Sequence, residues 1–258
     1  MNKYSVFGLH YCATNYEEAS DLIIQHAKAR ISFTVAALPV HGLIESYRFE
    51  KFNKTANNID MVVPDGQPVR WALNSMYKLN LTHCVHGADL ALHVLAKASK
   101  LNLKLFLYGS YENTINRFAA FIKQEYPGVQ ICGMHPDRFR DATEEEDKQD
   151  IDMINNSGAQ IVFVGRGCPR QEYWIDAHKN KVNASMLAIG GAFDWHAKTV
   201  KRAPMWMRKL ALEWFYRLLV EPRRLWKRYL ITNSIYIYLM FKYSLGKMIG
   251  MESKNKSL

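Results

Sequence analysis

Short apolar runs alternate with helix-like amphipathic segments along most of the chain. The runs are rich in β-branched and aromatic residues, as is typical of buried strands. We expect strands at residues 32–38, 61–63, 103–108, 129–132, 160–164 and 185–189. We expect helices at residues 16–29, 69–77, 88–99, 112–125, 143–156 and 170–178. Nearly continuous apolar strands between amphipathic helices predict an α/β fold, with a mainly parallel sheet covered by helices on both faces.

The composition supports a folded protein in a reducing compartment. Of the 258 residues, 48% are hydrophobic, and only 14 are Gly and 8 are Pro, which excludes a disordered or low-complexity chain. The four cysteines, Cys12, Cys84, Cys132 and Cys168, are far apart and form neither a disulfide framework nor a zinc motif. The first residues lack the apolar core and cleavage site of a secretory signal, so we expect the protein to stay in the cytoplasm.

The net charge of +10 comes from the end of the chain. Residues 198–258 contain 14 Lys and Arg but only 3 acids, whereas residues 1–197 contain 20 Lys and Arg and 21 acids. We therefore predict a body at 1–197 and a basic, aromatic, helical appendage at 198–258. Such an appendage indicates an anionic partner, which could be a membrane surface, a phosphate-rich ligand or a nucleic acid.

The appendage contains one apolar run, at residues 229–241. Its 13 residues are fewer than the roughly 20 that a membrane-spanning helix needs. Lysine, arginine and aromatic residues flank the run, as is typical of helices in the headgroup zone of a bilayer. We favour peripheral attachment to a membrane; the alternative is a helix docked on the protein's own core.

Two junctions that follow expected strands carry candidate chemistry, because ligands of parallel α/β folds bind at the carboxyl ends of the strands. Asp65, Gly66 and Gln67 follow the run at 61–63, where Asp65 could face a ligand or simply cap the next helix. Gly109 and Ser110 follow the run at 103–108, where a Gly turn and a helix N-terminus suit a phosphate. The alternative for Ser110 is an ordinary helix N-cap.

Two further junctions are rich in glycine. Gly165, Gly167, Arg170 and Gln171 follow the run at 160–164, and this combination favours a ligand site over a turn with solvated polar residues. The pair Gly190 and Gly191 follows the last run, where the alternative is a tight turn.

The Asp150-Ile151-Asp152 segment has the Asp-x-Asp form that metal-dependent sugar transferases use. Residues two apart on a helix do not face each other, so these two would chelate an ion poorly. We interpret the segment as a charged surface face and expect no metal site.

Six stretches in order resemble the WecG/TagA/CpsF family of bacterial sugar transferases. The stretches are VPDGQPVRWALN, VHGADL, LFLYGS, VGRGCPRQEYWI, IGGAFDWHA and KRAPMWMRKLALEWFYRLLVEPRRLWKRYL. The resemblance implies a Rossmann-like fold and inverting transfer of a sugar from a UDP-sugar to an acceptor on a polyprenyl diphosphate, without a metal or other cofactor. It also implies an appendage that helps to complete the active site at the membrane.

The resemblance assigns roles to residues. Asp65 becomes the general base, and Thr34, Gly87, Asp89 and Gln171 join the donor or acceptor site. The arginines expected to contact diphosphate or membrane are Arg202, Arg217, Arg223, Arg224 and Arg228. Two departures affect the choice of sugar: Ala36 replaces an Asn that family members often have, and Cys84 replaces an Arg. Donors of the N-acetylmannosamine or its uronate, glucose and glucuronate types therefore all stay open.

His86 and His196 are candidate hydrogen-bond donors near the site, but we favour structural roles for both. We expect a cytoplasmic protein, peripheral on the inner face of the cell membrane, that acts in cell-surface polysaccharide synthesis. The sequence leaves a homo-oligomer open. An oxidoreductase is the rival enzyme, although no G-x-G-x-x-G is present. A nucleic-acid-binding protein is the rival outside enzymes, and we expect no nucleic-acid partner.

Overall fold

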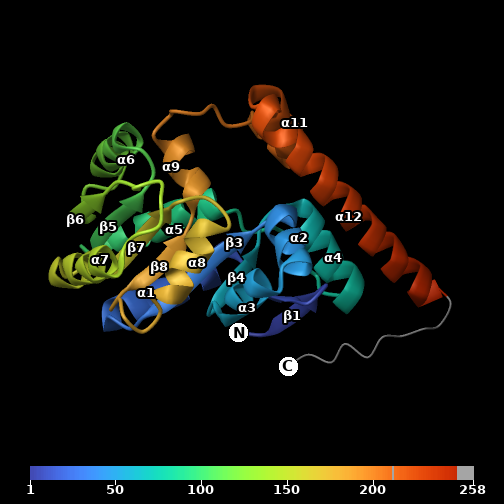
Figure 1. Cartoon of the computed structure of the whole chain (residues 1–258), viewed down its shortest axis with the longest axis horizontal. Helices are drawn as coiled ribbons and strands as arrows, with labels where there is room; N and C mark the ends of the chain where they lie inside the picture. The colour runs from blue at the N-terminus through green and yellow to red at the C-terminus, as the bar shows by residue number, and fades with distance from the viewer. Residues whose placement is uncertain (211, 249–258) are drawn as a thin grey trace.

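A computed structural model describes residues 1–210 and 212–248, without the side chains of Arg208, Lys209, Arg224 and Met248. Its centre is a six-stranded sheet in the order β4-β3-β8-β7-β5-β6 (Figure 1). All neighbouring strands are parallel. The strands are β3 (Phe33–Leu38), β4 (Met61–Pro64), β5 (Lys104–Gly109), β6 (Gln130–His135), β7 (Ile161–Gly165) and β8 (Ser185–Ala188). The α/β, Rossmann-like prediction is confirmed.

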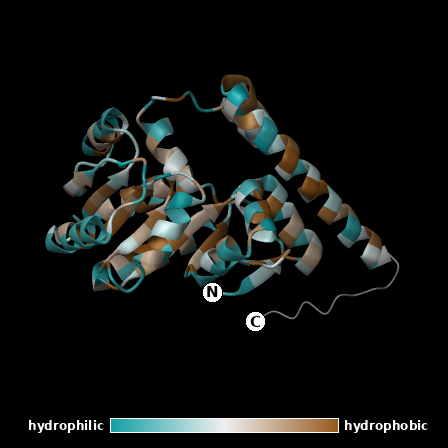
Figure 2. Cartoon of the chain, in the orientation of Figure 1, coloured by the Kyte–Doolittle hydropathy of each residue, from teal (hydrophilic) through white to brown (hydrophobic). Residues whose placement is uncertain are grey.

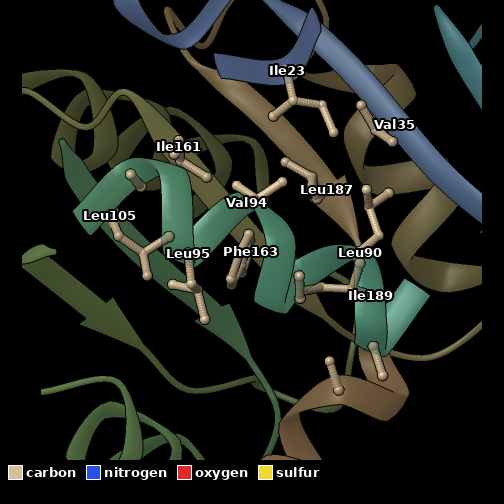
Figure 3. Close-up of a cluster of buried hydrophobic side chains, with 14 of the residues drawn as sticks. Ile23, Val35, Leu90, Val94, Leu95, Leu105, Ile161, Phe163, Leu187 and Ile189 are labelled. Atoms are coloured by element: carbon tan, nitrogen blue, oxygen red, sulfur yellow. The ribbon is translucent and has the colours of Figure 1, made fainter. Parts of the chain in front are cut away.

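Helices cover both faces of the sheet and bury a separate apolar cluster on each. One cluster lies under α1 (Tyr16–Ala29), α5 (Gly87–Lys100), α6 (Glu112–Glu125) and α9 (Gly190–His196). In it, Leu90, Val94 and Leu95 of α5 lie over strand residues that include Leu105 and Phe163 (Figure 3). The other cluster lies under α2 (Val40–Arg48), α3 (Glu50–Asn58), α4 (Gln67–Tyr77), α7 (Glu144–Asn156) and α8 (Arg170–Ala177).

Some elements were not predicted from the sequence. An antiparallel hairpin of β1 (Lys3–Val6) and β2 (Leu9–Cys12) precedes α1. Its tight turn places Phe7 and Gly8 at positive φ, 48° and 89°. Helices α2 and α3 fill the connection between β3 and β4, so the polar stretch after β3 is helical rather than a loop.

The end of the chain forms a helical appendage of α10 (Met205–Lys209), α11 (Glu213–Val220) and α12 (Pro222–Met248). Helix α12 packs on α2 and runs past α4, as Figure 1 shows. Its residues Leu225, Thr232 and Leu239 are buried against the body. Within the described residues, no helix is long and apolar enough to cross a membrane.

Because the strands are parallel, the four candidate junctions lie at one edge of the sheet. Thr34 does not lie at this edge, although the resemblance implies that it joins the site. It is the second residue of β3, about 13 Å of strand before Leu38, which pairs with Pro64 just before Asp65. There the Thr34 hydroxyl and backbone N–H both donate to Asp60 Oδ2 at 2.9 Å, so Thr34 stabilises the opposite edge.

The interpretation of Asp150-Ile151-Asp152 as a charged surface face is wrong for Asp150. This carboxylate is buried and accepts hydrogen bonds from Arg138, at 2.6 and 2.9 Å, and from the Tyr108 hydroxyl, at 2.6 Å. Asp150 therefore joins α7 to the sheet. Within the described part of the chain, no group of three or more His, Cys, Asp and Glu is arranged to hold a metal ion.

Candidate functional site

Asp65 lies at the carboxyl end of β4 with a partly open carboxylate. Its backbone N–H donates to Leu38 O of the neighbouring strand at 3.4 Å, which continues the ladder and fixes the main chain. The next residue, Gly66, is the N-cap of α4, so Asp65 is not a helix cap. About a quarter of the Asp65 side chain is exposed (24%), enough for a ligand to reach it. Asp65 is thus a partly exposed carboxyl group at the carboxyl end of a strand.

His86 is the direct partner of Asp65. Its Nδ1 lies 2.6 Å from Asp65 Oδ1, and its Nε2 lies 3.2 Å from Cys84 Sγ. Burial would lower the pKa of His86, but the charge and hydrogen bond of Asp65, helped by Cys84, outweigh it and raise the pKa to about 11. At neutral pH the pair is therefore a carboxylate next to an imidazolium. Apart from the histidine in VHGADL, no sequence pattern predicts this contact.

Gln67, the first residue of α4, carries an unpaired polar atom two residues after Asp65 in the sequence. Its Oε1 is buried, and no hydrogen-bond partner for it occurs in the described residues. A buried amide oxygen costs free energy unless it is paired, so this atom is suited to accept a hydrogen bond from a bound ligand.

Gln171 clamps two of the glycine junctions together. Its Oε1 accepts hydrogen bonds from the backbone N–H of Gly167, at 3.1 Å, and of Gly190, at 3.0 Å. Its Nε2 donates to Glu172 at 2.9 Å. The side chain is buried rather than solvated, and it joins the loops after β7 and β8. Burial raises the pKa of its neighbour Glu172 to about 7.

A second cluster of charged side chains lies at the same edge of the sheet. It comes from the segments after β6 and β7 and also contacts the segment after β5. Asp137 pairs with Arg166 at 3.1 Å and with Arg170 at 3.0 Å, and its backbone N–H donates to Ser110 O at 2.9 Å. The N-cap of α6 is Tyr111, so Ser110 is not a simple cap. We did not predict Asp137 as a site residue, although a carboxylate shortly after the expected strand at 129–132 could have indicated it. Arg170 remains 37% exposed and can still meet an anion.

Most of the expected glycines are required by packing inside the protein. A Cβ on Gly165 would lie 2.7 Å from the Phe193 ring, and one on Gly190 would lie 2.6 Å from Gln171 Oε1. The same crowding holds at Gly87 and Gly109, whose Cβ would meet Ala37 and Gly165. Gly191 has ordinary contacts with Trp195, whereas Gly66 and Gly167 face open space. Among these glycines, only Gly66 and Gly167 therefore leave room for a ligand to approach the backbone closely.

The appendage is joined to the body through Arg202. Its guanidinium binds both oxygens of Asp89, at 2.6 and 2.9 Å, and its Nε lies 3.3 Å from Glu213 of α11. Arg202 and Arg217 both lie over the Trp195 ring, 4.8 and 5.3 Å from its centre. Asp89 and Arg202, expected at the substrate, therefore bind each other. His196 Nε2 donates a hydrogen bond to Ala88 O at 3.0 Å, which fits the structural role.

Helix α12 comes close to the Asp65 junction. The Tyr236 hydroxyl donates to Pro68 O at 2.6 Å, three residues after Asp65. Arg228 lines a hollow of about 320 Å³ between α12 and α2, together with Glu45, Arg48 and Lys227. Arg223 is exposed, and the side chain of Arg224 lies outside the described part.

These features define an α/β protein with a candidate ligand site at the carboxyl edge of its sheet. The family model described as "Glycosyl transferase WecG/TagA/CpsF family" matches residues 4–249, so the chain belongs to this family of glycosyltransferases.

Relatives in three bacteria carry the same name, N-acetylglucosaminyldiphosphoundecaprenol N-acetyl-beta-D-mannosaminyltransferase. The protein of Bacillus spizizenii (strain W23) is 32% identical over 82% of this chain and 79% of its own length. That of Bacillus subtilis (strain 168) is 28% identical over 89% and 88%. That of Staphylococcus aureus (strain NCTC 8325) is 31% identical over 74% and 71%.

Proposed function

We propose that the protein transfers a sugar from a UDP-sugar to a saccharide on a polyprenyl diphosphate, with inversion and without a metal ion, in cell-surface polysaccharide synthesis. The observation that carries the proposal is Asp65, a partly open carboxylate at the strand edge with one oxygen already bonded to His86. The names of the relatives support the lipid-linked acceptor. The donor is of the N-acetylmannosamine or its uronate, glucose or glucuronate type.

Asp65 acts as the general base in this proposal. Its second oxygen, Oδ2, takes the proton from the acceptor hydroxyl while the hydroxyl oxygen attacks the anomeric carbon from the face opposite UDP. The bond between the anomeric carbon and the diphosphate oxygen breaks, and its electron pair leaves with UDP. One displacement of this kind inverts the anomeric centre.

The negative charge that develops on UDP needs preorganised positive groups. The N-terminus of α6 follows Ser110, and Arg170 extends an exposed guanidinium over the same edge. We assign the diphosphate to this side, and we assign Gln67 Oε1 to a hydroxyl of the sugar or acceptor. Arg217 and Arg228 on the appendage are suited to the second diphosphate, that of the lipid.

A screen of UDP-sugars against a synthetic polyprenyl diphosphate–N-acetylglucosamine tests this assignment. We expect one donor to give a lengthened lipid-linked saccharide of inverted configuration, with a rate that is unchanged by EDTA. Salt-sensitive RNA binding without transfer from any UDP-sugar would instead favour the nucleic-acid alternative, and reduction of a nicotinamide cofactor would favour the oxidoreductase.

We further propose that residues 198–258 hold the body, residues 1–197, at an anionic membrane surface from the cytoplasmic side. On α12, Trp226, Leu230, Ile237 and Phe241 are each at least 55% exposed, and their spacing of four and seven residues places them on one face of the helix. Figure 2 shows apolar and polar positions alternating along the ribbon of this helix. The basic residues Lys227 and Lys242 are exposed near this face. An exposed apolar stripe with basic flanks suits a helix that lies in the headgroup zone.

Sedimentation with anionic vesicles tests the attachment. Each of Ile237 and Phe241 would contribute about 1.5–3 kcal/mol by burial, so Ile237→Asp/Phe241→Asp should weaken binding by roughly 100-fold or more. The matched control is Ile31→Asp/Leu101→Asp, which places the same substitutions at exposed positions of the body. Equal vesicle binding by the α12 variant and the wild type would contradict the proposal.

A further inference from the structure

We infer that His86 is the positioning residue of the general base: it holds Asp65 Oδ1 in a hydrogen bond and thereby directs Asp65 Oδ2 to the acceptor hydroxyl. The inference rests on the proposed function, in which Asp65 is the base. It deepens that function by naming the group that sets the orientation and ionisation of the carboxylate.

The imidazole of His86 is fixed at both nitrogens. Nδ1 lies 2.6 Å from Asp65 Oδ1, and Nε2 lies 3.2 Å from Cys84 Sγ. A ring flip would therefore break both contacts. The ring is 23% exposed, similar to Asp65 at 24%, so the pair is shielded from most but not all of the solvent.

The main chain around His86 is equally constrained. Its backbone N–H donates to the Tyr16 hydroxyl at 3.0 Å, and the preceding Val85 N–H donates to Pro64 O at 3.0 Å. The following Gly87 lies so close to β3 that a Cβ there would be 3.0 Å from the Ala37 Cβ. The segment that carries His86 is thus attached to the strand that carries Asp65, and the two side chains have a fixed relative position.

The charge of His86 favours the reactive form of the base. The ring is cationic at neutral pH because the Asp65 carboxylate, helped by Cys84, raises the pKa of His86 despite burial. A cation at hydrogen-bond distance favours the ionised carboxylate, which is the form that can accept a proton. In the transfer step Asp65 Oδ2 gains the acceptor proton and His86 keeps its own, so the proton balance of the reaction is unchanged.

The other ionisable groups around the pair are Cys84, Tyr11, Tyr16 and Asp89. Burial raises the pKa of both tyrosines, so they stay neutral, and Asp89 is bound by Arg202. Neither tyrosine therefore adds a charge beside Asp65 at neutral pH, and the charge of Asp89 is met by Arg202.

Kinetics of His86→Ala and His86→Asn in the full chain test the inference. Alanine removes both the hydrogen bond and the charge, and loss of alignment of a reacting group can lower the rate by about 100-fold. We expect kcat of His86→Ala to fall by about that factor, with KM for the UDP-sugar nearly unchanged. Asparagine can place an N–H near the position of Nδ1 and should recover part of kcat.

A double variant separates positioning from a general loss of structure. If His86 acts through Asp65, then Asp65→Asn/His86→Ala should be no slower than Asp65→Asn alone, because residues that act as a unit are not additive. Multiplied losses in the double variant would overturn the inference. So would a His86→Ala enzyme with the wild-type kcat.

An NMR titration tests the pair without any activity. The Cε1–H signal of His86, identified by its loss in His86→Asn, should stay in the imidazolium form from about pH 6 to 9 in the wild type and titrate near or below about 6.5 in Asp65→Asn. Titration of His86 near 6.5 in the wild type would overturn the inference. If the wild type transfers no sugar from any donor, the proposed function fails, and this titration still decides whether the pair exists.

Discussion

The ion pair between Arg202 and Asp89 should couple the appendage to the body strongly. The pair has bidentate geometry, and its side chains are only 16% and 27% exposed. Fully exposed pairs contribute about 0.2–1 kcal/mol, whereas residues in contact within a shielded network show coupling of up to about 3 kcal/mol. We expect a coupling free energy of about 2 kcal/mol, which is between these limits because water still reaches part of the pair.

A double-mutant cycle measures this coupling. Urea unfolding of the wild type, Asp89→Asn, Arg202→Gln and the double variant gives the four free energies of unfolding. Arg202→Gln should lower the free energy of unfolding more than Asp89→Asn does. The first substitution takes the Arg202 cation from both Asp89 and Glu213, whereas the second keeps the 3.3 Å contact of Arg202 with Glu213.

The matched control is the pair Glu50 and Lys54, with N···O at 2.7 Å and side chains 80% and 76% exposed. Its cycle with Glu50→Gln and Lys54→Gln should show no measurable coupling, because solvent screens the charges. A coupling between Arg202 and Asp89 no larger than that of the control would refute the reasoning that this contact anchors the appendage.

Two further predictions concern the stability of the segments that form the site, at Glu172 and Gly165. Burial raises the pKa of Glu172 to about 7, so the contribution of this group to stability is greatest below its unfolded value of about 4.5 and is lost as the pH rises toward 7; Glu172→Gln should lack this loss and gain about 3 kcal/mol relative to the wild type between about pH 4 and pH 8. An equal difference in free energy of unfolding at both pH values would contradict the assignment. Gly165→Ala should destabilise by about 1–3 kcal/mol in thermal or urea unfolding, because its Cβ would meet the Phe193 ring at 2.7 Å, whereas Gly191→Ala, in α9 with its nearest contact at 3.5 Å, should be neutral or slightly stabilising. Equal stability of the two glycine variants would show that the Phe193 contact relaxes without cost.

The sheet was predictable because its strands are buried on both faces and therefore read as continuous apolar runs. The hairpin of β1 and β2 was not, because four-residue strands with mixed polarity give little periodic signal. Helices α2 and α3 were missed for a related reason: neither has a side-chain cap at its N-terminus, since their N-caps are Pro39 and Phe49. Tertiary packing, rather than local signals, forms these elements.

The site was predictable where a strand end alone decides the position, as for Asp65. It was not predictable where two segments meet. The contact between Asp65 and His86 joins residues 21 positions apart, and the contact between Asp89 and Arg202 joins residues 113 apart. Thr34, which the resemblance assigns to the donor or acceptor site, lies near the start of β3, at the opposite edge of the sheet. Gln171 and four of the glycines lie at the expected edge, but their contacts there are with other parts of the protein.

The central claim is that Asp65 is the base for sugar transfer, and the most direct test compares the wild type with Asp65→Asn. Both proteins are supplied with the UDP-sugar found in the screen and with the polyprenyl diphosphate-linked acceptor, and kcat and the UDP-sugar affinity are measured. We predict that kcat falls by about 10²–10⁴-fold while the affinity stays close to that of the wild type. Wild-type turnover by Asp65→Asn would contradict the account.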